Sequence, residues 1–91
     1  MKFRPIIVDE CCGKRLANYL RKQGEVVYFF NKRKDKDIMG IADLVGAYII
    51  TRDRDFNSYE NAIYVHGKTF AEIDNMVKTL QRCEIEPKYT G

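Results

Sequence analysis

The sequence has no long apolar run and little net charge, and both absences restrict what the protein can be. No stretch approaches the roughly 18 consecutive apolar residues of a membrane span, and the beginning, MKFRPIIVDE, lacks a signal-peptide pattern. The formal net charge is only +3, which does not indicate a strongly basic nucleic-acid binder. We therefore expect a cytoplasmic protein without a membrane partner.

Cysteine and histidine are scarce, and their spacing argues against two kinds of site. Cys11, Cys12 and Cys83 are an odd number without a C-x-x-C spacing, so neither a disulfide framework nor a structural zinc site is indicated. Cys11 and Cys12 could carry redox chemistry at a helix start, or one could be buried and the other half-exposed. We favour the second alternative, because reduced thiols are ordinary in the cytoplasm. The single histidine, His66, is only a weak indication of catalysis.

The composition is that of one globular domain. Hydrophobic residues make up 45% and charged residues 32% of the 91 residues, without an internal repeat, a low-complexity segment or a linker. A chain of this length can bury somewhat more than about 60% of its unfolded surface, which permits one modest core. We expect a single domain over residues 1–91, with a frayed tail at 84–91.

Four apolar runs predict strands, and three periodic patterns predict helices. The runs are nearly continuous, which is typical of strands buried on both faces of a parallel sheet, and they cover residues 6–8, 26–30, 47–50 and 62–65. Apolar stripes predict helices over about 11–23, over about 35–45 and from residue 70, the last opened by a capping box of Thr69 and Glu72. The alternation predicts an α/β fold, a three-layer α/β/α sandwich around a parallel sheet of about four strands.

Acidic residues gather at one edge of this expected sheet. They follow the first strand, open the second helix and follow the third strand: Asp9 and Glu10, Asp35 and Asp37, Asp53 and Asp55. Open α/β sheets bind ligands at the carboxyl ends of their strands, and clustered carboxylates need a cation to offset their repulsion. Hard oxygen ligands suit Mg²⁺ or Mn²⁺, which could activate water and stabilise a phosphoryl group. The same residues could instead be helix caps and surface charges.

The order of these motifs resembles short PIN-like nuclease domains, which are relatives of the VapC toxins. The likeness rests on Asp9-Glu10, on residues 16–24 (LANYLRKQG), on residues 35–38 (DKDI) with Ala42, and on residues 51–56 (TRDRDF). It extends from about residue 6 to residue 82. The Asn-Leu-Pro that commonly follows D-E in the family is replaced here by Cys11-Cys12-Gly13.

The resemblance implies an α/β/α fold and the cleavage of RNA phosphodiesters with Mg²⁺ or Mn²⁺ as cofactor. It implies that Asp9, Asp35 and Asp53 bind the metal and that Asp55, close by, joins them as a catalytic residue. It further implies a toxin of a toxin–antitoxin pair. The expected partners are therefore an RNA substrate and an antitoxin-like protein, and a homodimer is a further expectation.

Basic residues border these carboxylates and form the expected substrate-binding surface. Lys32, Arg33 and Lys34 follow the second strand, whereas Arg52 and Arg54 alternate with the acids after the third. Binding of a phosphate backbone requires such groups beside a metal site. A lysine-rich solvated loop is the alternative interpretation.

The aromatic residues divide into expected core residues and one expected surface residue. The strand positions predict a core role for Tyr28, Phe29, Phe30, Tyr48 and Tyr64. Tyr59, in the loop before the fourth strand, is then the candidate for stacking on a base.

Two other functions remain open from the sequence. One is a non-catalytic binding module for nucleic acid or protein that keeps the fold and the basic residues. The other is a phosphoacceptor regulator, since an acidic pair after the first strand resembles receiver domains. Those domains need an aspartate that ends the third strand, whereas Asp53 here follows Thr51-Arg52, so we rank this function last.

Overall fold

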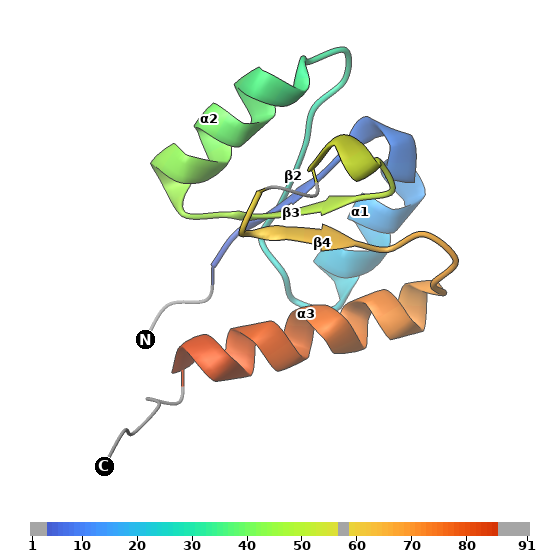
Figure 1. The fold of residues 1–91 in the computed structure, drawn as a ribbon. Coiled ribbons are helices and arrows are strands. Elements are labelled where there is room, and N and C mark those ends of the chain that lie inside the picture. The colour runs from blue at the N-terminus through green and yellow to red at the C-terminus, as the bar shows by residue number, and fades with distance from the viewer. Residues whose placement is uncertain (1–3, 57–58, 86–91) are drawn as a thin grey trace.

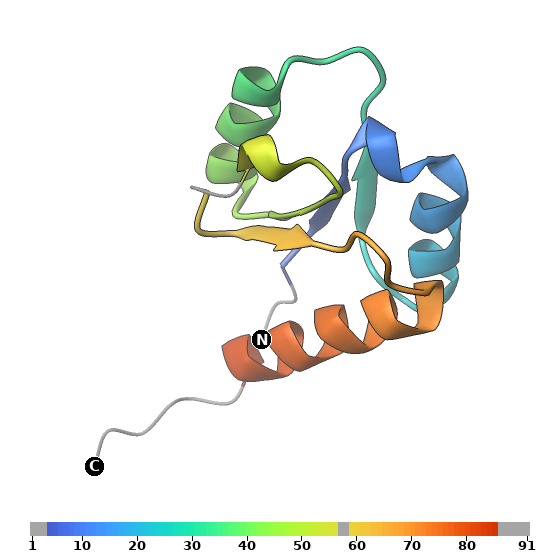
Figure 2. The same cartoon turned by 45° about the vertical axis from the view of Figure 1, so that its right-hand side comes forward.

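Residues 4–56 and 59–85 are described by the computed structural model, and within them a parallel sheet lies between two helical layers (Figure 1). The strands are β1 (Ile6–Val8), β2 (Val27–Phe29), β3 (Tyr48–Thr51) and β4 (Ala62–Tyr64). The helices are α1 (Lys14–Lys22), α2 (Asp35–Val45) and α3 (Phe70–Ile85), with short 3₁₀ turns η1 (Glu10–Cys12) and η2 (Arg54–Phe56). Helix α2 covers one face of the sheet, and α1 and α3 cover the other (Figure 2). The predicted α/β/α sandwich with a four-stranded parallel sheet is confirmed.

The sheet separates two apolar cores, because successive side chains of a strand point to opposite faces. Ile6 and Val8 of β1 belong to the core beneath α1 and α3, whereas Ile7 between them belongs to the core beneath α2. Helix α2 contributes Ile38 and Ala42, one turn apart, to that second core. Strand β1 is thus buried on both faces, which is why it reads as a continuous apolar run.

The strand order β2-β1-β3-β4 leaves β2 and β4 at the edges of the sheet. All residues of β1 and β3 are buried, but Tyr28 in β2 and Tyr64 in β4 are exposed. The prediction of strands buried on both faces is therefore right for the central pair and wrong for the edges. Tyr28 and Tyr64 are not core residues, because an edge strand has a neighbouring strand on one side only.

Glycines in left-handed backbone conformations set two of the helix ends. Helix α1 begins at Lys14 and not near residue 11, because Gly13, with φ of 86°, separates it from η1. Helix α2 ends at Gly46, which adopts φ of 71° and donates its N–H to the carbonyl oxygen of Ala42. Such a conformation costs glycine little, since it has no Cβ.

Helix α3 opens with the predicted capping box. The N–H of Thr69 donates to Glu72 Oε1 at 2.8 Å, and the N–H of Glu72 donates to Thr69 Oγ1 at 3.1 Å. The helix continues to Ile85, two residues into the segment expected to be frayed, and residues 86–91 lie outside the described part of the chain. No described helix is long and apolar enough to cross a bilayer.

The chain reverses its direction across the sheet between β1 and β3. From β1 it passes along α1 to β2 on one side, and α2 then carries it over to β3 on the other side of β1. Open α/β sheets bind ligands in the crevice at such a switch point, outside the carboxyl ends of the strands. The residues that follow Val8 and Thr51 are therefore the first place to look for a functional site.

Candidate functional site

Asp9 joins the carboxyl ends of β1 and β3. Only 7% of this residue is exposed. Its Oδ2 accepts a hydrogen bond from Thr51 Oγ1 at 2.8 Å and a second from Cys11 Sγ at 3.2 Å. The backbone N–H of Asp9 donates to the carbonyl oxygen of Ile50 at 2.9 Å. Main chain and side chain together therefore fix this carboxylate at the switch point.

The two carboxylate oxygens of Asp9 are used differently. Oδ2 takes both side-chain hydrogen bonds, whereas Oδ1 accepts none from the described residues. Burying a carboxylate is costly unless hydrogen bonds replace its water, and Thr51 and Cys11 supply that replacement on one side. The other oxygen remains available to a ligand.

Thr51 connects Asp53 to Asp9, a link that sequence reasoning missed. While its hydroxyl donates to Asp9, the same oxygen accepts the backbone N–H of Asp53 at 2.9 Å. Thr51 is 1% exposed, so these bonds are made away from water. A threonine at the end of an apolar strand was the only signal in the sequence, and it is a weak one.

A small pocket adjoins Asp53 beside β3 and β4. Its volume is about 60 Å³, and it is lined by Thr51, Asp53, Phe56, Ala62 and Tyr64. Asp55 lies within η2, but its side chain is outside the described part of the structure, so its catalytic role stays a prediction.

Asp35 lies at the start of α2, not in front of it. The residue at the N-cap is Lys34, whose side chain makes no capping hydrogen bond, so the interpretation of Asp35 as the N-cap is wrong. Asp35 and Asp37 both lie in the first turn, where the helix dipole favours negative charge. Because α2 follows β2 in a parallel sheet, this turn lies at the carboxyl edge.

Topology thus brings Asp9, Asp35 and Asp53 to one edge, and hydrogen bonds through Thr51 connect the Asp9 carboxylate with the backbone of Asp53. Among the side chains that the structure describes, which exclude that of Asp55, no three of His, Cys, Asp or Glu are grouped closely enough to hold one metal ion. A metal shared by all three aspartates therefore stays a prediction.

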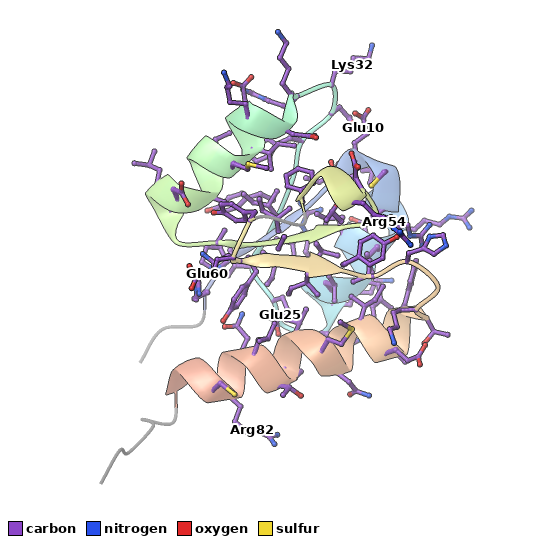
Figure 3. All side chains as sticks on the ribbon, viewed as in Figure 1. Glu10, Glu25, Lys32, Arg54, Glu60 and Arg82 are labelled. Atoms are coloured by element: carbon purple, nitrogen blue, oxygen red, sulfur yellow. The ribbon has the colours of Figure 1, made fainter. Side chains whose placement is uncertain are left out.

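The basic loop after β2 is attached to the residue that follows Asp9. The backbone N–H of Lys32, whose φ is 57°, donates to Glu10 Oε1 at 3.1 Å. Arg33 and Lys34, like Lys32, are exposed. Figure 3 shows Glu10, Lys32 and Arg54 on the side toward which the strands point. The loop therefore borders the carboxylates, as predicted from its position after β2.

Arg52 and Arg54 are exposed at the same edge, and each is held by a different neighbour. The backbone N–H of Arg52 donates to Cys11 Sγ at 3.4 Å. The Nε of Arg54 donates to Tyr64 Oη at 3.3 Å. Both guanidinium groups are accessible to a phosphate, and their role in binding RNA stays a prediction.

The two adjacent cysteines differ in their environment. Cys12 is buried and its Sγ donates to the carbonyl oxygen of Ile50 at 3.7 Å. Burial first, and the neighbouring Cys11 second, raise the pKa of the Cys12 thiol to about 12. Cys11 is exposed and contacts Asp9, as described above. One thiol is buried, as expected, whereas the other is exposed and not half-exposed, and no sequence pattern indicated that Cys11 contacts Asp9.

Tyr59, the candidate for stacking on a base, is half-buried. Its ring packs against the core beneath α2, and its Oη donates to Asp43 Oδ1 at 2.6 Å. Burial, followed by that hydrogen bond, raises the pKa of Tyr59. Its role in stacking on a base stays a prediction, and Tyr64 is an exposed tyrosine beside the pocket.

Comparison with known proteins identifies no family for this chain: no protein-family model, no curated protein and no solved structure matches it. The resemblance to PIN-like domains stays a prediction from the motifs. What the site does must be inferred from its own chemistry.

Proposed function

We propose that the chain is a metal-dependent ribonuclease whose cation binds at the β1–β3 switch point. The observation that supports this most is the state of Asp9, a buried carboxylate with Oδ2 held by Thr51 and Cys11 and Oδ1 unused by the described residues. A carboxylate that serves only as a surface charge needs no such support. Hydrogen bonds that orient one part of a ligand while another part stays open are typical of metal sites.

The donor set suits Mg²⁺ or Mn²⁺. Mg²⁺ keeps several of its waters and is commonly bound by one or two carboxylates together with substrate phosphates. In this proposal Asp9 supplies one carboxylate and Asp53, whose backbone N–H bonds to Thr51, supplies the second, so no third close carboxylate is needed. Asp35, in the first turn of α2, adds negative charge at the same edge. The bound cation would stabilise the charge that develops on the phosphoryl oxygens.

The residues of the chain itself would bind and orient the RNA backbone. Lys32, Arg33 and Lys34 lie beyond the end of β2, and Arg52 and Arg54 lie beyond the end of β3, on the other side of β1. A backbone that crosses this edge would meet positive charge on both sides of Asp9. Following the motif resemblance, we extend the proposal to a cytoplasmic toxin with an antitoxin-like partner.

The test is the substitution Asp53→Asn, which keeps the shape of the side chain and removes its charge. The backbone N–H that bonds to Thr51 is unaffected. We expect the variant to lose Mn²⁺-dependent cleavage of RNA and also the rise in melting temperature that Mn²⁺ gives the wild type. At about ten times Kd that rise reflects about 1.4 kcal/mol, or several degrees for a domain of this size.

The matched control is Glu60→Gln, the same chemical change at an exposed residue away from the carboxyl edge (Figure 3). This variant should keep both cleavage and the melting shift. A wild-type protein that neither cleaves RNA nor responds to millimolar Mn²⁺, but still binds RNA, would refute the nuclease and support the binding module. An Asp53→Asn variant that melts far below the wild type without metal would make Asp53 a structural residue.

A further inference from the structure

Three flat side chains lie in a row along the outer margin of β4. Tyr64 is 36% exposed. The guanidinium carbon of Arg54 lies 5.8 Å from the centre of this ring, in addition to the hydrogen bond between the two side chains. The His66 ring lies 6.2 Å from the Tyr64 ring at an interplanar angle of 26°. An arginine, a phenol and an imidazole that are all exposed thus lie next to one another at the end of β4.

This row is connected to the carboxylate site by the small pocket. Tyr64 and Asp53 line that pocket together, with Thr51 between the pocket and Asp9. The register of the sheet explains the proximity, because Tyr64 pairs with Thr51 at the end of β3. A chain molecule that extends from Asp53 toward β4 would therefore pass close to the Tyr64 ring.

The pocket itself is too small to enclose a nucleobase. Its volume of about 60 Å³ accommodates only a few water molecules. Pockets that enclose a small ligand measure about 300–1,000 Å³. A base at this position would have to lie on the ring surface and not inside a cavity.

We propose that Tyr64, flanked by Arg54 and His66, is a stacking surface for an unpaired base of single-stranded RNA. This inference rests on the proposed nuclease, since it places the neighbouring phosphate at Asp9 and Asp53. Aromatic rings and guanidinium planes bind base faces, which are accessible in single strands and covered in a duplex. Stacking reads no hydrogen-bond pattern, so the surface tolerates any base.

Strand β2, the edge strand on the other side of the sheet from β4, provides a matched control. There Tyr28 is 42% exposed, its ring lies 6.3 Å from that of Phe30, and Arg33 lies 5.4 Å from the centre of the Phe30 ring. The side chains are similar, but Tyr28 does not line the pocket beside Asp53. If RNA bound nonspecifically to any exposed ring of an edge strand, it would affect Tyr28 in β2 and Tyr64 in β4 equally.

The chain contains no tryptophan, so a single one can report on each edge. Tyr64→Trp and Tyr28→Trp would each be titrated with a single-stranded RNA of roughly ten nucleotides, in EDTA to prevent cleavage. We expect the RNA to quench the fluorescence of the Tyr64→Trp protein more strongly than that of the Tyr28→Trp protein, because Tyr28 lies beside the basic loop but not beside the pocket at Asp53. Tyr64→Leu should weaken binding of the same RNA by about 5- to 140-fold and leave duplex binding unchanged.

The outcomes separate this inference from the nuclease itself. Quenching at Tyr64→Trp in a protein that never cleaves RNA supports the stacking surface and refutes the nuclease. Unchanged fluorescence at Tyr64→Trp, or equal quenching at both edges, overturns the stacking surface even if the protein cleaves RNA. Should Tyr64→Leu fail to fold, the two tryptophan variants decide the question, because both retain a large aromatic ring.

Discussion

Asp9 owes its place in the site to residues far from it in the sequence. Thr51, which bonds its carboxylate, is 42 positions away, whereas Cys11 is only two positions away. The position of Asp9 at the end of an apolar run was predictable, because a strand end is a local pattern. Its hydrogen-bond partners were not, because they depend on which strands become neighbours.

The contrast between Cys11 and Cys12 yields a prediction about thiol reactivity. The thiolate is the nucleophile, and with its pKa at about 12 only about 1 in 10,000 Cys12 thiols is ionised at pH 8. Cys12 is also buried, whereas Cys11 and Cys83 are exposed. In the folded protein we expect iodoacetamide to modify Cys11 and Cys83 and to leave Cys12 unmodified, as measured by mass spectrometry of the intact chain.

Single substitutions make the assignment unambiguous, because Cys11 and Cys12 are adjacent. Cys11→Ser protein should gain one label and Cys12→Ser protein two, and each should gain two in urea. The raised pKa also predicts that Cys12 becomes reactive only as the pH approaches 12 or the protein unfolds. Rapid labelling of Cys12 at pH 8 in folded Cys11→Ser protein would contradict the buried environment.

At the scale of elements, the order of strands and helices followed from the sequence, but the exposure of each strand did not. The patterns over residues 6–8 and 26–30 look alike, yet β1 is central and β2 is at an edge. An apolar run indicates that a strand packs against apolar residues, but it does not indicate whether the strand is central or at an edge of the sheet. The exposed rings of Tyr28 and Tyr64 were missed for this reason, and with them the surface beside the site.

The loop between β2 and α2 carries a prediction of its own. Replacing Lys32, Arg33 and Lys34 with alanine removes three exposed positive charges beside Glu10. Each lost phosphate contact should lower the slope of log K against log salt by about 0.7 for a single strand, so we expect a loss of about 2. Binding of RNA by fluorescence anisotropy at several salt concentrations measures this slope.

A control for this prediction removes charge from elsewhere on the molecule. Lys22, at the end of α1, and Arg82, in the last turn of α3, are both exposed. Alanine at these two positions should leave the salt slope unchanged. Equal slopes for the wild type and the loop variant would mean that the loop is a solvated surface without contact to RNA.

At the scale of the molecule, hydrogen bonds connect helix α3 to the sheet at the amino ends of the strands, opposite the carboxylates. Gln81 of α3 is 1% exposed, and its amide bonds to the main chain before β1: Nε2 donates to the carbonyl oxygen of Arg4 at 2.6 Å, and Oε1 accepts the N–H of Arg4 at 2.9 Å. Nε2 also donates to Glu25 Oε1 at 3.0 Å, and Lys78 Nζ lies 2.6 Å from Glu25 Oε2. Helix α3 is thereby fixed to the sheet and to the loop before β2.

This arrangement predicts that Gln81 contributes to stability and not to the site. Gln81→Leu keeps the volume of the side chain but removes the buried partner of both Arg4 backbone groups and of Glu25. Leaving buried polar groups without that partner should lower the free energy of unfolding by about 2–4 kcal/mol, as measured by urea denaturation. Gln23→Leu, at an exposed residue after α1, should change the free energy of unfolding by less than about 0.5 kcal/mol.

Because Gln81 acts at the amino ends of the strands, away from the carboxylates, Mn²⁺ should still raise the melting temperature of Gln81→Leu by as much as it raises that of the wild type. A Gln81→Leu protein that kept its stability but lost the response to Mn²⁺ would show instead that α3 determines the geometry of the carboxylates.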